Sequence, residues 1–397
     1  MSEDVVRHAL GELPVPDEAG AAERAWDVVA AAFASRERVQ WTRRHRGLVI
    51  AFAAATLVAA AVLVALLTPP GQAVVDRVRD AVGREPSEPA LVRLPAPGRL
   101  LVVSEDGPWV VLEDGSKRLL GDYDDASWSP TGLYVVASEG RHLVALEPEN
   151  GDVRWSLARD EPVRDPRWSG GGLDTRIAYR AGSTLHVVAG DGSPDAAVAQ
   201  DVAPVAPAWK ADTHVLAYAE RNGRVHVVDV DARRQLERTR RLSGIRKLAF
   251  SPEGMLVVLT QRQARLYRGG TARGIGIRVD RAHSLLDAIV LRAGEVVYAD
   301  YDPKADNTTI VLAHDFGRTT SVLLPPLEIF KGPREVESFS VSPNGQWLAA
   351  GWPEANQFLF FRLPHGRVAA VSNVTREFSP GTTDGAFPRI GGWAPGP

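Results

Sequence analysis

The 397-residue chain has no cysteine. Disulfide bonds, thiolate nucleophiles and zinc or iron–sulfur centres held by cysteine are therefore excluded. An excess of one charge is also absent, because the formal net charge is −3. No strong overall field then favours nucleic acid or an acidic substrate as a partner. Lysine is scarce, and the resulting arginine bias is typical of a high-GC bacterial genome.

The short motifs of common enzyme classes are absent as well. The sequence has no HExxH, no Gly-x-Ser-x-Gly, no Walker loop and no GxGxxG. The glycine-rich stretch RGGTARGIGIRV, residues 268–279, lacks the spacing of such a motif, and we predict a long turn there. We therefore expect no catalytic residue, no metal site and no cofactor, and we predict that the protein is not an enzyme.

Charge is missing from one long segment near the N-terminus. Residues 47–67 are uncharged throughout, and about 20 helical residues span about 30 Å, the thickness of a bilayer core. The segment predicts a single transmembrane helix. A cleaved signal peptide is the alternative, but it would need an unusually long stretch before the apolar segment. Arg43, Arg44 and Arg46 directly precede the segment, so we expect a cytoplasmic N-terminus and a C-terminal part outside the plasma membrane.

The residues on either side of this span have different patterns. Residues 1–46 predict a cytoplasmic tail with an amphipathic helix, in which Trp26, Val29 and Phe33 share one face. That face either lies on the membrane surface or docks a cytoplasmic partner. Residues 68–97 predict a proline-rich stalk, since proline ends the helix and keeps the following chain extended.

From residue 98 onward the pattern changes to short strands separated by glycine, proline, aspartate and asparagine turns. An aromatic residue followed by a turn and an apolar strand recurs at Trp128, Trp168, Trp209 and Phe250, with spacings of 40, 41 and 41 residues. A later copy has Val341 in the aromatic position, and the degenerate stretch DAIVLRAGEVVYADY fills the gap before it. The fixed period predicts an all-β fold, a β-propeller of four-stranded blades over residues 98–397.

Each position of the repeated unit has a physical reason. The aromatic side chain ends the innermost strand and packs between neighbouring blades. Proline presets φ in the following turn, and glycine takes the positive φ that the turn needs. The positions that we assign to the blade repeat are Trp128, Pro130, Gly132, Trp168, Trp209, Phe250, Pro252, Gly254, Pro343, Gly345 and Trp393.

The two ends of this domain complement each other. Residues 98–121 supply three strands without the strand that should precede them, and GAFPRIGGWAP at the C-terminus supplies one strand with Trp393. We predict that the C-terminal strand completes the first blade. A ring of seven blades then closes, and the exposed edges of an open sheet are removed.

The units WSPTGLYVVA and FSPEGMLVVL resemble the repeats of TolB-like and WD40-like bacterial propellers, in which the pattern is aromatic-Ser-Pro-Asp-Gly. The chain departs from that pattern at the aspartate, which is replaced by Thr131, Gly171, Glu253 or Asn344. The resemblance covers residues 98–397 and implies the fold. It does not identify a ligand, because propellers host many functions.

Two charged clusters are candidate contacts. Asp300, Asp302 and Asp306 have an alternating spacing that fits either a solvated loop or a weak cation site. The segment 231–247 carries seven basic and two acidic residues, which predicts an exposed outer strand and loop. Its alternative role is contact with an anionic wall polymer, headgroup or protein, and the residues concerned are Arg233, Arg234, Arg238, Arg240 and Arg241.

Together these features predict a single-pass membrane protein that presents an extracytoplasmic propeller as a protein- or ligand-binding module of the cell envelope. We expect a protein or an envelope polymer as its partner, and no nucleic acid. The order of tail, span, stalk and sensor-sized domain resembles membrane-bound regulators such as anti-sigma factors, so signalling through the tail is one alternative. The other is a hydrolase or lyase that uses the central funnel, which would need convergent carboxylates or histidines from several blades.

Overall fold

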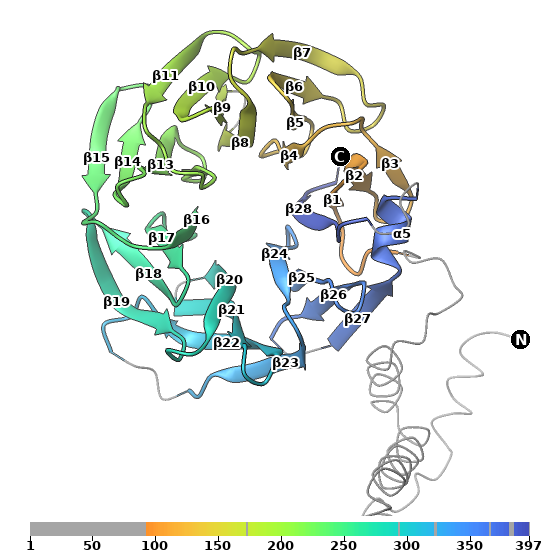
Figure 1. Ribbon diagram of the computed structural model, residues 1–397, viewed down its shortest axis with the longest axis vertical. Coiled ribbons are helices and arrows are strands. Elements are labelled where there is room, and N and C mark those ends of the chain that lie inside the picture. The colour runs from red at the N-terminus through yellow and green to blue at the C-terminus, as the bar shows by residue number, and fades with distance from the viewer. Residues whose placement is uncertain are drawn as a thin grey trace, which may run out of the picture. The chain divides into compact units, whose positions relative to one another are not determined.

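The computed structural model describes residues 93–171, 174–292, 294–320, 324–364, 367–380 and 385–396. The predicted tail with Trp26, Val29 and Phe33, the predicted membrane span 47–67 and most of the predicted stalk lie outside these residues. Within the described ranges no helix has the length and apolar character that crossing a membrane requires. These residues form seven four-stranded antiparallel sheets arranged around a common axis (Figure 1). The prediction of an all-β, seven-bladed propeller is confirmed.

The blades follow one another around the ring, and the strands of each are named from the innermost to the outermost. Blade one consists of β28 (Arg389–Ala394), β1 (Arg99–Ser104), β2 (Gly107–Val111) and β3 (Lys117–Leu119), and blade two of β4 (Asp125–Trp128), β5 (Val135–Glu139), β6 (His142–Leu146) and β7 (Val153–Ala158). Blade three consists of β8 (Val163–Gly171), β9 (Asp174–Ala181), β10 (Thr184–Ala189) and β11 (Asp195–Ala199), and blade four of β12 (Ala208–Trp209), β13 (Val215–Ala219), β14 (Val225–Asp229) and β15 (Arg234–Arg238).

The remaining three blades continue in chain order. Blade five consists of β16 (Ile245–Phe250), β17 (Leu256–Thr260), β18 (Gln263–Arg268) and β19 (Thr271–Arg278), and blade six of β20 (Ser284–Arg292), β21 (Gly294–Asp302), β22 (Asn307–Phe316) and β23 (Leu327–Pro333). Blade seven consists of β24 (Glu337–Val341), β25 (Trp347–Trp352), β26 (Gln357–Arg362) and β27 (Arg367–Ser372). A short helix, α5 (Val374–Phe378), lies between β27 and β28.

The ring closes through the C-terminal strand, as predicted. β28 pairs antiparallel with β1, and Leu100 stands opposite Trp393. The Trp393 ring also packs edge-on against Phe360 of blade seven, with 5.8 Å between ring centroids. The last strand of the chain therefore joins the first blade to the last one and covers the edge of β1, which would otherwise be unpaired.

The repeat aromatics lie on the innermost strands and face the preceding blade. Trp128 ends β4 and packs with Leu101 of blade one. Trp168 lies on β8 and packs with Val136 of blade two. The second strand of most blades is almost wholly buried, since neighbouring blades cover both of its faces; all five residues of β17 are buried, for example.

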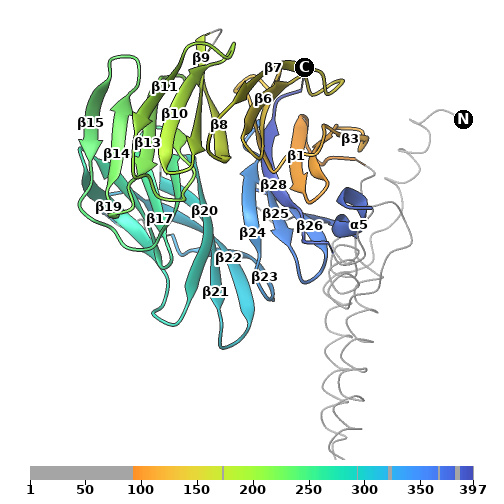
Figure 2. The same cartoon turned by 45° about the horizontal axis from the view of Figure 1, so that its top comes forward.

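Blade six differs from the others in strand length, with nine, nine and ten residues in β20, β21 and β22. Its strands extend past those of the neighbouring blades in Figure 2. Only residue 293 separates β20 from β21, so the Ser-Pro turn of blades two, five and seven has no room here. This tight hairpin explains why the sequence copy in this blade is degenerate.

Two local features differ from or go beyond the sequence analysis. The prediction of a long turn over residues 268–279 is wrong. Gly269 and Gly270 turn the chain at positive φ, but Thr271–Arg278 then forms β19, the outer strand of blade five, which pairs with β18. The helix α5 was not predicted; its Phe378 is fully buried and packs edge-on against Trp109.

The antiparallel blades give the ring two distinct faces. Turns between the first and second strands, and between the third and fourth, lie on one side, which we call the hairpin face. Turns between the second and third strands, and the connections from one blade to the next, lie on the other side, which we call the crossover face. The residues that line a cavity can therefore be assigned to a face from the turn that holds them.

Candidate binding site

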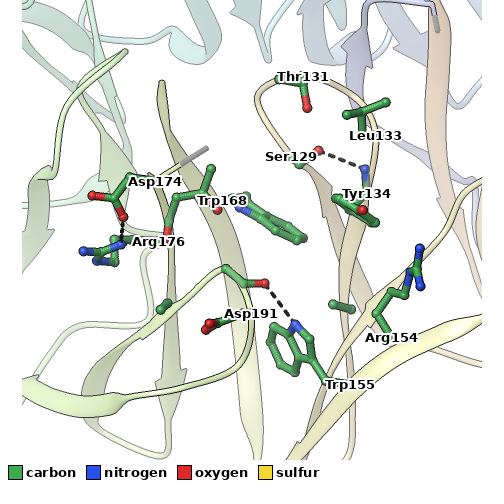
Figure 3. A pocket seen from close by; sticks show the side chains of 14 residues that line it. Ser129, Thr131, Leu133, Tyr134, Arg154, Trp155, Trp168, Asp174, Arg176 and Asp191 are labelled. Atoms are coloured by element: carbon green, nitrogen blue, oxygen red, sulfur yellow. Dashed lines mark hydrogen bonds and ion pairs between the residues drawn. The ribbon is translucent and has the colours of Figure 1, made fainter. Parts of the chain in front are cut away.

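A cavity of about 580 Å³ opens on the hairpin face between blades two and three. The β4–β5 turn and β7 contribute to it from blade two, and β8, β9 and the β10–β11 turn contribute from blade three. Its volume lies in the range of about 300–1,000 Å³ that is typical of ligand sites. Figure 3 shows side chains from both blades converging on this space.

Three aromatic rings form the apolar walls of this cavity. Tyr134 from blade two stacks on Trp168 from blade three, with ring centroids 6.1 Å apart and an angle of 16° between the planes. Trp155 on β7 donates its indole N–H to the carbonyl oxygen of Gly190, at 3.0 Å. The rings thus join the two blades across the cavity, and their positions are fixed by stacking and hydrogen bonding.

The β4–β5 turn that carries Tyr134 is held by one backbone hydrogen bond and one bond to a serine hydroxyl. Ser129 N–H donates to the Tyr134 carbonyl oxygen at 2.8 Å, and the Ser129 hydroxyl accepts the Tyr134 N–H at 2.9 Å. Gly132 takes a φ of +73° in this turn. The serine and glycine of the repeated unit therefore position an aromatic residue of the cavity as well as the hairpin.

Charged groups of both signs surround these rings. Arg154 lies over the Tyr134 ring at 6.0 Å, and its side chain is 54% exposed. Arg176 and Asp174 line the blade-three side and form an ion pair with each other. Asp191 also lines the cavity, and its carboxylate accepts the Ser193 N–H at 3.0 Å. The site can therefore hold an apolar group flanked by charges of either sign.

A half-buried polar network joins the same two blades away from the cavity. Arg159, after β7, donates to the Tyr179 hydroxyl at 2.6 Å, and that hydroxyl donates to Asp195 at 2.5 Å. Arg159 also forms an ion pair with Asp195, and His186 lies 3.3 Å from the same carboxylate. A connected network of this kind fixes the two blades relative to each other.

The environment shifts the pKa of two members of this network. Burial alone raises the pKa of Asp195, but hydrogen bonds from His186 and Tyr179 and the charge of Arg159 outweigh it, so the net pKa is lowered. Burial, followed by the contact with Asp195, raises the pKa of Tyr179 far above its usual value. Asp195 is therefore charged and Tyr179 neutral at ordinary pH.

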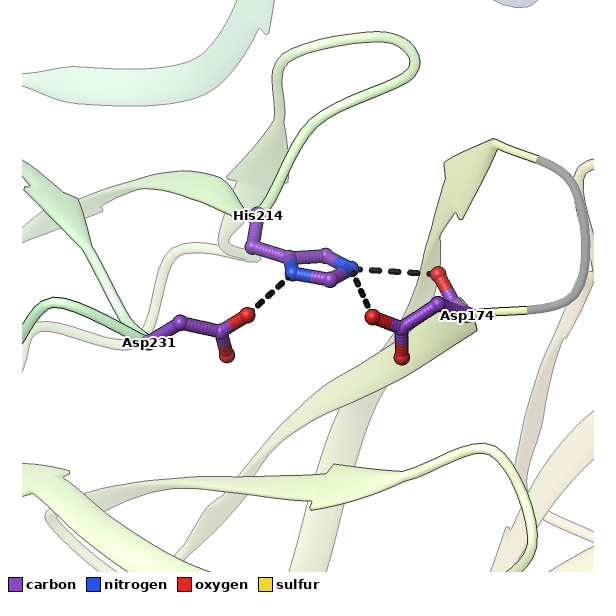
Figure 4. Close-up of side chains that lie close together, drawn as sticks. All are labelled: Asp174, His214 and Asp231. Carbon is purple, nitrogen blue, oxygen red and sulfur yellow. Dashed lines mark hydrogen bonds and ion pairs between the residues drawn. The ribbon is translucent and has the colours of Figure 1, made fainter.

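A second polar cluster on the hairpin face lies where blade three meets blade four. The His214 ring stands between two carboxylates in Figure 4, with Nδ1 next to Asp231 at 2.5 Å and Nε2 3.8 Å from an Asp174 oxygen. Nε2 also lies 3.1 Å from the Asp174 carbonyl oxygen. Sequence analysis did not find this cluster, since Asp174 at the start of β9 and the blade-four turn residues His214 and Asp231 are far apart in the sequence.

These three residues could offer one atom each to a metal ion, and among the described residues no other group of this kind is present. The two carboxylates approach opposite nitrogens of the ring, however, and Arg176 contacts both of them. A metal would have to displace the guanidinium. The arrangement therefore fits a charge-compensated contact between two blades better than a metal centre.

Buried charges also link the innermost strands. These strands surround the central funnel, so an enzyme that used the funnel would need catalytic residues on them. Asp125 forms ion pairs with Arg389 of blade one and Arg167 of blade three. Asp287 accepts Lys247 Nζ of blade five at 2.6 Å. Both carboxylates are thus engaged in contacts between blades.

Glu337, on the innermost strand of blade seven, has a perturbed environment. Burial, followed by the negative charges of Glu335 and Asp287, raises the pKa of Glu337. The neighbouring Arg246 charge acts in the opposite direction. The Glu337 residue is nevertheless exposed to solvent at the start of its strand. No histidine lies on an innermost strand within the described residues.

The predicted charged clusters are placed apart from the cavity. Asp300 lies 2.9 Å from His283 and Asp302 lies 3.7 Å from the other nitrogen of that ring, whereas Asp306 contacts Tyr301 and Arg334. The structure therefore does not bring the three aspartates together around one point. Of the predicted anion contacts, Arg234 and Arg238 lie on the outermost strand β15, Arg233 precedes it, and Arg240 and Arg241 follow it; all five are exposed.

Comparisons with known proteins identify the fold. No protein-family model and no curated protein matches the sequence. A chain in the crystal structure of the mitotic checkpoint complex is 15% identical, with a TM-score of 0.52 over 70% of this chain and 95% of that chain. Kluyveromyces lactis Hsv2 is 12% identical, with a TM-score of 0.48 over 67% of this chain and 89% of that chain.

Kuenenia stuttgartiensis hydrazine synthase is also similar, at 12% identity and a TM-score of 0.47 over 61% of this chain and 76% of that chain. At such low identity these likenesses concern the fold alone. The resemblance to WD40-like propellers therefore holds for the seven-bladed architecture alone, while the narrower resemblance to TolB-like bacterial propellers stays a prediction.

Proposed function

We propose that the chain is a single-pass membrane protein that presents its propeller outside the cell as a non-enzymatic binding module. The observation that carries the binding role is the cavity between blades two and three, with its three aromatic walls and charged rim. The uncharged segment 47–67 and the arginines before it support the membrane anchor and its orientation.

The chemistry of the cavity favours a protein partner. Tryptophan, tyrosine and arginine are the residues most enriched where protein interfaces gain their binding energy, and Trp155, Tyr134 and Arg154 meet here. The rings suit an apolar side chain, and the rim suits flanking charges of both signs. We propose a polypeptide segment with that pattern as the occupant. A solved neighbour in the mitotic checkpoint complex belongs to a multiprotein assembly, which is consistent with this proposal.

Signalling through the N-terminal tail is an extension of this role. It requires that binding at the propeller change what the tail contacts. Deletion of residues 1–40 distinguishes a plain binding protein from a signalling regulator. If the protein only binds, the deletion variant still captures the same partner and gene expression does not change. A change in gene expression on that deletion supports the regulator.

The binding role is tested with the full-length chain in its native membrane. A photo-crosslinking residue replaces Leu133, which lines the cavity and is 50% exposed. We expect one partner to be crosslinked, to be lost in Arg154→Glu, and to be kept in the control Arg141→Glu, whose position is the exposed β5–β6 turn on the crossover face of the same blade. An equal adduct from a crosslinker at residue 141, or no adduct at residue 133, would refute the proposed site.

The anchor and its orientation need a separate measurement. An epitope tag is placed after Pro397, and intact cells are treated with an external protease. We expect loss of the tag without cell lysis, and recovery of the protein in the membrane fraction after an alkaline wash. Protection of the tag until lysis would contradict the proposed orientation, and release by the wash would contradict the span.

A further inference from the structure

A second cavity, of about 730 Å³, lies on the crossover face around blade five. Three connections form it: the loop from β15 to β16, the β17–β18 turn, and the loop from β19 to β20. Its lining is polar, in contrast to the aromatic cavity on the opposite face. The residues that bear on its chemistry are Ser243, Gln261, Arg262, Gln263, Arg278 and Arg281.

Positive charge dominates this lining. Arg262, Arg278 and Arg281 are all exposed, and none forms an ion pair with a carboxylate among the residues that the structure describes. Asp280 is the one acidic residue in the lining, and its carboxylate accepts the Ala282 N–H at 3.0 Å. Three guanidinium groups therefore share one cavity with a single carboxylate in a protein whose net charge is −3.

Some exposed arginines elsewhere on the ring form ion pairs, and others, such as Arg233 and Arg268, form none that involve the described residues. Arg164 pairs with Asp124, Arg292 with Glu295, and Arg334 with Asp306. The cavity arginines lack such partners within the described residues, so their donors remain available to an incoming anion. Guanidinium groups bind phosphate and carboxylate groups through two parallel hydrogen bonds.

The backbone beneath these side chains is preorganised. Gln261 N–H donates to Gly244 O at 3.2 Å, which ties the β17–β18 turn to the first connection. Val279 N–H donates to Arg262 O at 3.1 Å, which ties the same turn to the third connection. Leu285 N–H donates to Gln261 O at 2.7 Å, which ties the turn to the start of β20. A framework that is already cross-linked loses little conformational entropy when a ligand binds.

From this cavity, its three arginines and its cross-linked frame we infer a binding site for a small anion with at least two negative charges, carried by phosphate or carboxylate groups. The site is independent of the proposed protein-binding cavity, because it lies on the other face of the ring and shares no residue with it. Ser243, Gln261 and Gln263 supply further hydrogen-bonding groups around the anion.

The test uses the full-length chain in phosphatidylcholine nanodiscs, with pyrophosphate as the soluble probe in titration calorimetry. Each of Arg262→Gln and Arg278→Gln should weaken binding about tenfold, since a hydrogen bond to a charged group has about that effect. The matched control is Arg118→Gln/Arg141→Gln, which removes two exposed arginine charges from blades one and two, outside the cavity lining. Thermal unfolding of every variant checks that the fold is kept.

Two arms distinguish the source of the anion. Binding of pyrophosphate that depends on Arg262 and Arg278 supports a soluble ligand. Co-sedimentation with phosphatidylglycerol-containing vesicles, but not with phosphatidylcholine vesicles, and with the same arginine dependence, supports a lipid headgroup. The inference is overturned if neither probe binds, or if the control double variant weakens binding as much as the cavity variants do, because general surface charge then explains the effect.

Discussion

Removal of the Asp287 carboxylate should destabilise the ring more than removal of an exposed carboxylate. Asp287 is 7% exposed and lies on β20. One of its oxygens accepts Lys247 Nζ at 2.6 Å and Ala288 N–H at 2.7 Å, and the other accepts Phe339 N–H at 2.9 Å. Because these partners lie on β16, β20 and β24, one side chain connects blades five, six and seven.

The magnitude follows from what Asp287→Ala leaves behind. Lys247 loses its counter-ion, and the buried Phe339 N–H loses its acceptor. Breaking a buried ion pair by removing one partner costs about 3–5 kcal/mol. The Lys247 side chain is 38% exposed, and water then solvates part of its charge, so we expect the lower end, about 3 kcal/mol. At about 2–4 °C per kcal/mol, the melting temperature should fall by about 6–12 °C.

The assay is thermal unfolding of the full-length chain in detergent, with Glu253→Ala as the control. Glu253 is exposed in the β16–β17 turn, so its removal should change stability by less than about 0.5 kcal/mol. Lys247→Met and the double variant complete a cycle, and the two changes should be non-additive by about 1–3 kcal/mol. A melting temperature of Asp287→Ala equal to that of the control, or strict additivity, would refute the reasoning.

Three further predictions concern the same propeller. Tyr179→Phe should lower the free energy of unfolding by about 1.5–3 kcal/mol, because the hydroxyl bridges two charged groups; denaturant titration checks this, and no change would mean that the bridge is not formed. The lowered pKa of Asp195 contributes stability above about pH 4, which is lost as pH falls through the folded-state pKa; the stability difference between wild type and Asp195→Asn should therefore shrink on acidification, and a constant difference would contradict the assignment. Trp393→Ala should cost about 3–5 kcal/mol, because it removes a buried ring that seals the closing blade; a variant that unfolds like wild type would show that closure does not depend on this ring.

Most of the fold could be predicted because the repeat is built from local requirements. Trp128 and Trp168 must fill the space toward the preceding blade, and Gly132 must take a positive φ. The residue types that meet these requirements therefore recur in the sequence at a fixed spacing. The closing strand was predictable because a missing first strand and an extra last strand complement each other. The prediction for 268–279 is wrong because the glycine content of this stretch outweighed the alternation of Ile275 and Ile277, which fits the β-strand seen there.

Three of the charged residues that join the blades occupy a fixed position in the repeated unit, and the sequence analysis did not use this position. Asp125, Lys247 and Asp287 each stand three residues before the aromatic position of their unit, which is Trp128, Phe250 and Val290 respectively. Asp125 and Asp287 also accept the N–H of the following alanine at the same distance, 2.7 Å. Lys247 and Asp287 occupy equivalent positions of neighbouring blades, so their opposite charges predict the ion pair between them. Asp125 pairs instead with Arg389 and Arg167, which occupy other positions of their units.

The candidate cavities could not be predicted in the same way, because the repeat constrains the buried strand positions and leaves the exposed side chains of strands and turns free. Arg154, Asp191 and Arg176 come from different segments, and no local spacing relates them to one another. Trp168 is the exception, since it satisfies the repeat and lines the cavity as well. Because Trp168 packs against the core and only part of its ring faces the cavity, its position is held as firmly as that of a core residue. Under the proposed binding role, the cavity offers a preformed apolar wall, and specificity comes from the charged residues Arg154, Arg176 and Asp191 around it.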